Sequence, residues 1–201
     1  MDVTIWHLEQ TSPQQLRPAR APGLDTTVAR VEEPLPEFNR FLYTAVGGNW
    51  HWTSRLAWTY EQWRDWLNRD GVETWVAMAL GAPAGYVELD GTAPGEVEIA
   101  YFGLMPQRHG YGLGGHLLTL ALRRAWDLAL RWTSLAETER VSVQTCSLDS
   151  PAALANYQSR GMRIYRTETS SSPDPGPAIG PWPGARAAAP ASENPPDSAG
   201  A

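Results

Sequence analysis

The chain has 201 residues, of which 42% are hydrophobic, and this length and composition are typical of one globular domain. Its formal net charge of -6 argues against binding to the phosphate backbone of nucleic acids, and no run of about 18 apolar residues predicts a membrane span. The first residues lack the basic-then-apolar pattern of a signal peptide, so the sequence predicts a cytoplasmic protein.

The first half of the chain is predicted to hold two strands, two helices and an antiparallel meander. Segments rich in β-branched and aromatic residues indicate strands at 3–8 and 27–31. Helices are expected at 37–46 and 59–68. Turns containing glycine and proline then separate three further strands, which are expected at 73–80, 84–89 and 96–105.

The second half is predicted to alternate between helices and strands. Apolar residues at helical spacing indicate a helix from 113 to about 130, and a strand is expected at 140–146. Asp149-Ser150-Pro151 supplies a capping side chain before a proline, which predicts a helix start, and Gly161 is expected to end that helix. A last strand is expected at 162–167, so the order of elements indicates a mixed α/β domain over residues 1–168.

From Thr169 the sequence reads TSSSPDPGPAIGPWPGARAAAPASENPPDSAGA. This text is rich in proline, serine, glycine and alanine and has no repeating apolar face to bury. Residues 169–201 are therefore expected to be a disordered tail, with an interaction segment built on Trp182 as the alternative.

The segment 107–118, QRHGYGLGGHLL, places four glycines in six residues immediately before a leucine-rich helix. Backbone N–H groups at the start of a helix lack carbonyl partners and lie at the positive end of the helix dipole, so they attract anions. Glycines also let a loop adopt positive φ and approach a diphosphate without a Cβ in the way. The segment is therefore expected to bind phosphate groups, and a glycine-rich turn without a ligand is the alternative.

Gly110, Gly112 and Gly115 also match the G-x-G-x-x-G pattern of dinucleotide-binding folds. The context fits that pattern poorly, because residues 106–109 separate the glycines from the preceding strand and the acid after the next strand, Asp149, is too distant. A P-loop is excluded because no Gly-Lys-Ser/Thr follows.

Three separated segments agree on one family. The first, His109-Gly110-Tyr111-Gly112-Leu113-Gly114, opens the helix that carries Leu117 and Leu118; the second is the preceding strand, EVEIAYFGLMP; the third is SPAALANYQSRGMRIYR. Together they resemble the GNAT superfamily of acyl-coenzyme A dependent N-acyltransferases, whose phosphate loop has the pattern Arg/Gln-x-x-Gly-x-Gly/Ala. The resemblance covers residues 73–166 and implies a mixed α/β fold, with a mostly antiparallel sheet, a splayed parallel pair of strands and flanking helices.

The resemblance implies acetyl-coenzyme A as cosubstrate and no metal ion. His109 occupies the position that the family usually gives to arginine or glutamine, so Arg108 is the candidate for the missing positive charge. A frame that starts at Gln107 restores the glutamine but displaces the leucine pair by two residues. The residues expected to bind the cofactor are Phe102, Leu104, His109, Gly110, Gly112, Leu113, Gly114 and Gly115.

In the family an amine attacks the thioester directly within a ternary complex. By resemblance, Glu98 takes the proton of the amine, Tyr157 donates to the departing sulfur, and the backbone N–H of Leu104 binds the thioester oxygen. A solvated strand carboxylate and a helix-packing tyrosine are the alternatives for the two side chains. Cys146, the only cysteine, excludes an internal disulfide; it lacks a recognisable His/Asp partner and is expected to be a buried strand thiol.

The segment 41–63, FLYTAVGGNWHWTSRLAWTYEQW, is rich in aromatic residues, and the family builds the acceptor wall from this part of the chain. Tyr43, Trp50 and Trp52 are the candidates for contacts with an amine, because aromatic faces attract cations. Packing in the core is the alternative for these rings. The expected partner is a small-molecule or peptidyl amine, and a homodimer is left open. A non-catalytic acyl-coenzyme A sensing module on the same fold is the second function considered.

Overall fold

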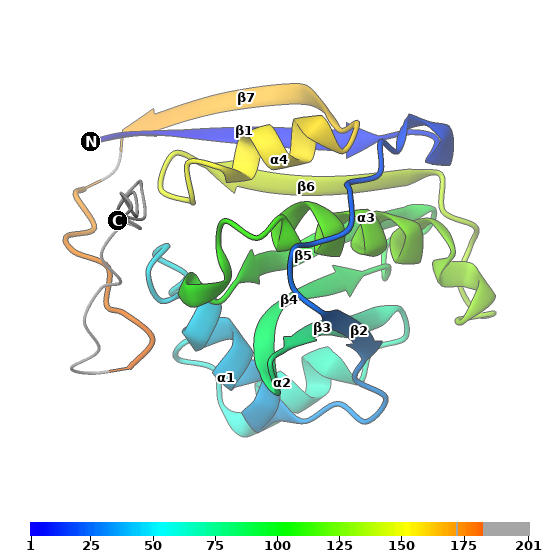
Figure 1. The fold of residues 1–201 in the computed structure, drawn as a ribbon, viewed down its shortest axis with the longest axis horizontal. Helices are drawn as coiled ribbons and strands as arrows, with labels where there is room; N and C mark the ends of the chain where they lie inside the picture. Colours follow the sequence, from blue (N-terminus) through cyan, green and yellow to red (C-terminus); the bar gives the residue numbers. More distant parts are fainter. Residues whose placement is uncertain (172, 183–201) are drawn as a thin grey trace, which may run out of the picture.

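The computed structural model describes residues 1–171 and 173–182. Within them, one sheet has the strand order β2-β3-β4-β5-β6-β1-β7 (Figure 1). Its strands are β1 (Asp2–Gln10), β2 (Thr26–Arg30), β3 (Val72–Ala79), β4 (Ala82–Asp90), β5 (Glu96–Leu104), β6 (Arg140–Cys146) and β7 (Arg163–Ser171). The helices are α1 (Pro36–Gly47), α2 (Tyr60–Leu67), α3 (Leu113–Trp126) and α4 (Ala153–Ser159).

The pairing of the strands confirms the mixed α/β fold expected from the sequence. β3, β4 and β5 form the antiparallel meander, and β2 adds to it at β3. β5 and β6 are parallel, but their pairing covers only Glu96 to Ile99 against Arg140 to Val143. Beyond this point the two strands separate, which is the splayed pair that the resemblance to the GNAT superfamily implies.

The position of β1 does not follow from the order of the elements along the chain. β1 lies between β6 and β7 and is antiparallel to both, so His7 is paired with Gln144 on one side and with Arg166 on the other. The first and last strands of the described fold are therefore neighbours, and the meander lies on the far side of β6 (Figure 1).

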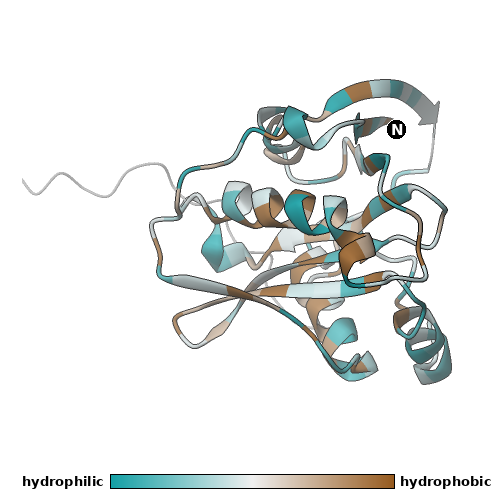
Figure 2. Ribbon diagram, turned by 90° about the vertical axis from the view of Figure 1, so that its right-hand side faces the viewer, coloured by the Kyte–Doolittle hydropathy of each residue, from teal (hydrophilic) through white to brown (hydrophobic). Residues whose placement is uncertain are grey.

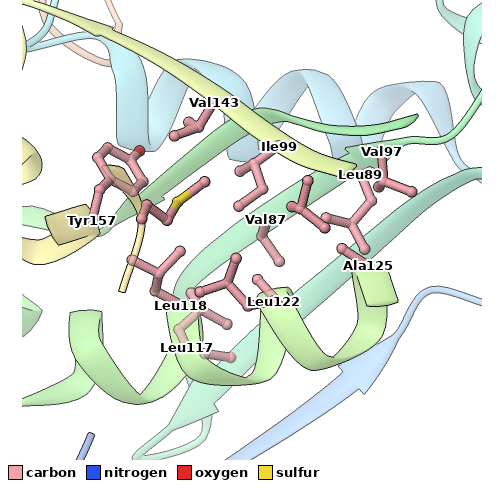
Figure 3. Packing of buried hydrophobic residues seen from close by; sticks show 14 of the residues in the cluster. Val87, Leu89, Val97, Ile99, Leu117, Leu118, Leu122, Ala125, Val143 and Tyr157 are labelled. Atoms are coloured by element: carbon pink, nitrogen blue, oxygen red, sulfur yellow. The ribbon is translucent and has the colours of Figure 1, made fainter. Parts of the chain in front are cut away.

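Helices cover both faces of the sheet (Figure 2). The larger core lies under α3, because Leu113, Leu117, Leu118 and Leu122 recur at helical spacing and are all buried against the sheet. Figure 3 shows this cluster, which also contains inward-facing side chains of β4, β5 and β6. α1 and α2 cover the opposite face with two smaller clusters. No helix in the described ranges is long and apolar enough to cross a bilayer.

α4 begins later than the sequence predicts. Its first residue is Ala153, and its N-cap position, Ala152, has no capping side chain. The carboxylate of Asp149 accepts instead from the Thr145 hydroxyl at 2.8 Å and from the Cys146 backbone N–H at 3.0 Å. Asp149 therefore fixes the end of β6, whereas Ser150, the residue just before Pro151, accepts from the backbone N–H of Ala152 at 3.4 Å, as the expected capping side chain should.

β7 runs three residues beyond the domain boundary that composition indicates at 168. Thr169, Ser170 and Ser171 pair with Thr4, Val3 and Asp2, so backbone hydrogen bonding to β1 extends the strand despite its polar side chains. Of the rest of the expected tail, residues 173–182 are described, and residues 172 and 183–201 lie outside the described ranges.

A buried carboxylate attaches the segment after α3 to the sheet. Glu73 of β3 is 2% exposed and accepts from the guanidinium of Arg131 at 2.7 and 2.8 Å. The indoles of Trp75 and Trp132 also donate to it, and Arg30 forms a further ion pair at 3.1 Å. Burial alone would raise the pKa of Glu73, but these donors outweigh burial and the pKa is lowered.

Candidate active site

The glycine loop joins β5 to α3 and has the backbone that the sequence predicts. Gly110 has φ +86° and Gly112 has φ +74°, a left-handed conformation that side chains rarely adopt. Gly112 is also the N-cap of α3, and no side chain caps the helix there. The first turn of α3 therefore keeps backbone N–H groups for an external acceptor.

The separation of β5 and β6 opens a cavity of about 580 Å³ between these strands, the glycine loop and α4. A register shift between Glu88 and Leu89 leaves Ala100 of β5 without a partner on β4, so β5 bends at this point. All eight residues expected to bind the cofactor line the cavity, namely Phe102, Leu104, His109, Gly110, Gly112, Leu113, Gly114 and Gly115. The cavity thus brings together the β5 strand end and the loop, as the sequence predicts.

The positive charge at the loop comes from a residue that the sequence analysis did not consider. Arg108 does not line the cavity, whereas Arg160, at the end of α4, does. Nε of Arg160 is buried and has no hydrogen-bond partner. A Cβ at Gly115 would overlap the Arg160 guanidinium, which lies directly against the first turn of α3. One signal in the sequence indicated it: Arg160 follows Tyr157 by three residues and so shares its helical face.

His109 is a poor source of that charge. Burial lowers the pKa of its imidazole, and a hydrogen bond with the backbone of Leu104 offsets this only in part. The ring is therefore neutral at pH 7 and holds the loop against the end of β5. Arg160 and the N–H groups of α3 form a cationic, hydrogen-bond-donating cradle, which fits the diphosphate of a coenzyme A.

Tyr157 lies where the cavity meets the core. Its ring is buried, with its centroid 5.9 Å from that of Phe102 on β5, and Figure 3 shows it at one end of the core cluster, next to Val143 of β6. Burial, and to a lesser extent the charge of Asp149, raises the pKa of the phenol well above its ordinary value. Tyr157 is therefore a neutral hydroxyl that can donate a hydrogen bond at the split between the strands.

Glu98 lies apart from Tyr157. Val97 and Ile99 point into the core under α3, so Glu98, between them, points to the opposite face of the sheet, and it does not line the cavity. Its neighbours across the strands are Asp90 and Ser142. Burial raises the pKa of Glu98, and the negative charges of Asp90 and Glu96 raise it further.

Of the three aromatic acceptor candidates, two line the cavity. Trp50 and Trp52, in the loop after α1, lie there together with Tyr101 of β5, whose ring centroid is 4.9 Å from that of Trp52. Tyr43 of α1 is 1% exposed and packs under these rings instead. It is a core residue, because its position on α1 faces the sheet.

Rings from the aromatic segment 41–63, from α2 and from β5 surround a cation of the protein itself. The guanidinium of Arg55 lies 4.1 Å from the ring centroid of Trp66 and 4.5 Å from those of Trp58 and Tyr101. It also pairs with the buried carboxylate of Glu88 at 2.8 Å. This aromatic cage is therefore filled, whereas Trp50 and Trp52, which line the cavity, have no arginine over their rings in the described part of the chain.

Two further residue classes bear on the chemistry. Burial raises the pKa of the Cys146 thiol, which disfavours the thiolate needed for nucleophilic attack. Among residues 1–171 and 173–182, no group of three histidine, cysteine or acidic side chains is arranged to hold a metal ion.

The comparison with protein families decides the assignment. A family model described as acetyltransferase (GNAT) family matches residues 35–162, which span the chain from α1 to the end of α4 and include the whole cavity. The chain belongs to the GNAT family. A comparison with curated proteins gives no significant match.

Solved GNAT structures share the fold at low sequence identity. A GCN5-related N-acetyltransferase from Kribbella flavida has 15% identity and a TM-score of 0.56, and the match covers 83% of this chain and 56% of that one. A GCN5-related N-acetyltransferase from Sphaerobacter thermophilus has 19% identity and a TM-score of 0.53, covering 82% and 49%. A putative acetyltransferase of the GNAT family from Novosphingobium aromaticivorans has 18% identity and a TM-score of 0.51, covering 84% and 63%. The chain therefore spans only about half to two thirds of the length of these GNAT proteins.

Proposed function

We propose that the chain is an acetyl-coenzyme A dependent N-acyltransferase that acetylates a small-molecule or peptidyl primary amine. The observation that carries the proposal is the cavity of a GNAT fold in which the glycine loop, the unpartnered Nε of Arg160 and the neutral hydroxyl of Tyr157 all meet. When bound, coenzyme A supplies the acyl group as a thioester.

The residues of the cavity divide into those that hold the cofactor and those that act on the reacting groups. The first turn of α3 and Arg160 bind the diphosphate, and the β5 backbone at Phe102 and Leu104 orients the pantetheine arm and the carbonyl oxygen. The Tyr157 hydroxyl donates a hydrogen bond to the departing thiolate and stays protonated itself, because burial raises its pKa; the thiolate takes its proton from solvent.

Glu98 is the proposed acceptor of the amine proton. Its raised pKa makes its carboxylate a stronger base than an ordinary glutamate. Because Glu98 faces away from Tyr157, the proton reaches it through water on the side of Tyr101 and of loop 47–52, which carries Trp50 and Trp52. The amine then enters from the face covered by α1 and α2, opposite the core under α3.

The decisive experiment measures thiol release from acetyl-coenzyme A across a panel of amines. Glu98→Gln and Tyr157→Phe should each lower turnover by about one to four decades while coenzyme A affinity stays within a few-fold. Glu96→Gln is the matched control for the first, because Glu96 lies on the same face of β5 but is paired with Arg140 at 3.1 Å. Tyr165→Phe, on the exposed β7, is the control for the second.

The outcomes separate the enzyme from the alternative. Coenzyme A binding without turnover on any amine would favour a non-catalytic acyl-coenzyme A sensor. Turnover on one amine with wild-type rates in both variants would mean that the catalytic roles belong to other residues: a loss of turnover in Glu96→Gln would then assign the base to Glu96, and otherwise His51 is the next base to replace.

A further inference from the structure

The segment after β7 returns to the acceptor side of the molecule. Residues 173–182 run from the end of β7 down to the loop that follows α1, and Figure 1 shows them in orange along one side of the sheet. The contact is specific: the backbone N–H of Gly180 donates to the carbonyl of Gly48 at 3.0 Å. Gly180 is buried, whereas Ile179 and Trp182 on either side are more than half exposed.

Two adjacent glycines, Gly47 and Gly48, let the loop 47–52 approach both Trp52 and the segment that contains Gly180. A Cβ at Gly47 would overlap the indole of Trp52, which lines the cavity. A Cβ at Gly48 would overlap the backbone of Gly180, and Pro181 N would lie 2.6 Å away. The pair thus lets the loop contact an aromatic ring at one residue and the C-terminal segment at the next.

The loop 47–52 contains features that need support from its surroundings. His51 has φ +58°, a left-handed conformation that is unfavourable for a residue with a Cβ. The side-chain oxygen of Asn49 is buried without a hydrogen-bond partner. The carbonyl of Gly47 accepts from the N–H groups of Trp50 and Trp52, at 2.8 and 3.3 Å, so the two tryptophans depend on the position of this one residue. Strain of this kind persists only where neighbouring structure holds it.

We infer that residues 178–182 form a strap that holds loop 47–52 and thereby positions Trp50 and Trp52 at the amine end of the cavity. The inference rests on the proposed function, because the strap can affect the amine site only if the chain binds an amine. Docking of the strap sets the affinity for the amine and leaves the diphosphate cradle unchanged, since no hydrogen bond in the described residues joins the segment to Arg160 or to the glycine loop.

The test breaks the contact from each side in the full chain. Gly48→Ala adds a Cβ that meets Gly180, and it leaves the backbone unstrained because Gly48 has φ -59° and ψ -27°. Gly180→Ala disturbs the other partner. Gly176→Ala is the matched control, because Gly176 has nearly the same φ, +72° against +73°, but its added Cβ would meet nothing within 4 Å. The double variant Gly48→Ala/Gly180→Ala completes a cycle.

Two readouts are needed, amide hydrogen exchange in residues 47–52 and the KM for the amine. Gly48→Ala and Gly180→Ala should each speed exchange and raise the KM by about two- to ten-fold, the range that one lost hydrogen bond covers. The double variant should be no worse than either single variant, coenzyme A affinity should not change, and Gly176→Ala should match the wild type.

Three results would overturn the strap: wild-type exchange in Gly180→Ala, equal effects of Gly176→Ala and Gly180→Ala, or additive effects in the double variant. Hydrogen exchange needs no substrate, so it decides the strap even if no amine is acetylated. Such a failure of turnover would count against the proposed function alone.

Discussion

Replacing Arg160 by methionine should move stability and cofactor affinity in opposite directions. A buried N–H without a partner costs about 1–3 kcal/mol. The lower end applies because, of the three guanidinium nitrogens of Arg160, only Nε is both buried and unpartnered. Methionine has a similar reach and no donor, so the unliganded protein should gain about 1 kcal/mol, or about 2–4 °C in melting temperature for a chain of this size.

The same change should weaken coenzyme A binding. A hydrogen bond between a guanidinium and a phosphate contributes about 1.5–3 kcal/mol, which corresponds to a loss of about 10- to 150-fold in affinity. Melting curves with and without coenzyme A, together with calorimetric titration, measure both effects. Arg123→Met is the control, because Arg123 is an exposed residue of α3 outside the cavity and should change neither. Unchanged affinity in a folded Arg160→Met protein, or a lower melting temperature without ligand, would refute the assignment.

Three further predictions concern single side chains. Gly112→Val should abolish the rise in melting temperature that coenzyme A causes, because φ is +74° there, and a normal rise in a folded variant would contradict the loop assignment. Glu98→Gln should stabilise the protein at pH 8 but not at pH 4. Folding raises the pKa of Glu98, so the contribution of this carboxyl group to the free energy of unfolding is fully present below about pH 4.3 and is lost as pH rises through the folded-state pKa. Equal melting shifts at the two pH values would count against this. Glu73→Gln should lower the free energy of unfolding in urea by about 3–5 kcal/mol, because it leaves Arg131 without its buried partner. Glu32→Gln, at the exposed end of the same network, should lower it little. Similar losses in both variants would show that burial of Glu73 is unimportant.

The local pattern of the sequence predicts the elements well. β6 begins and ends at the predicted residues, and the leucines of α3 are buried as their spacing indicates. Periodicity reports which face of an element is apolar, but it does not report which strands become neighbours. The position of β1 between β6 and β7 depends on contacts more than 130 residues apart, and no local pattern encodes them.

The same limit applies to the site. The glycine loop could be predicted because left-handed φ and close backbone approach demand a particular residue type. The partners of an arginine or a tryptophan are set by packing, so the aromatic segment alone did not show that Arg55 fills the cage or that Tyr43 lies in the core. Arg160 was missed for a related reason, since its importance comes from the absence of a partner, which a sequence cannot display.

The position of β1 between β6 and β7 also constrains the order in which the chain can fold during synthesis. Residues 2–10 are synthesised before both strands that flank them, because those strands lie after residue 139. The meander and α3 have their partners within the preceding chain and can form earlier, whereas the N-terminal strand must wait for β6 and β7. Its insertion between them is a late, long-range closure that completes the sheet, and until then β1 is a strand without partners.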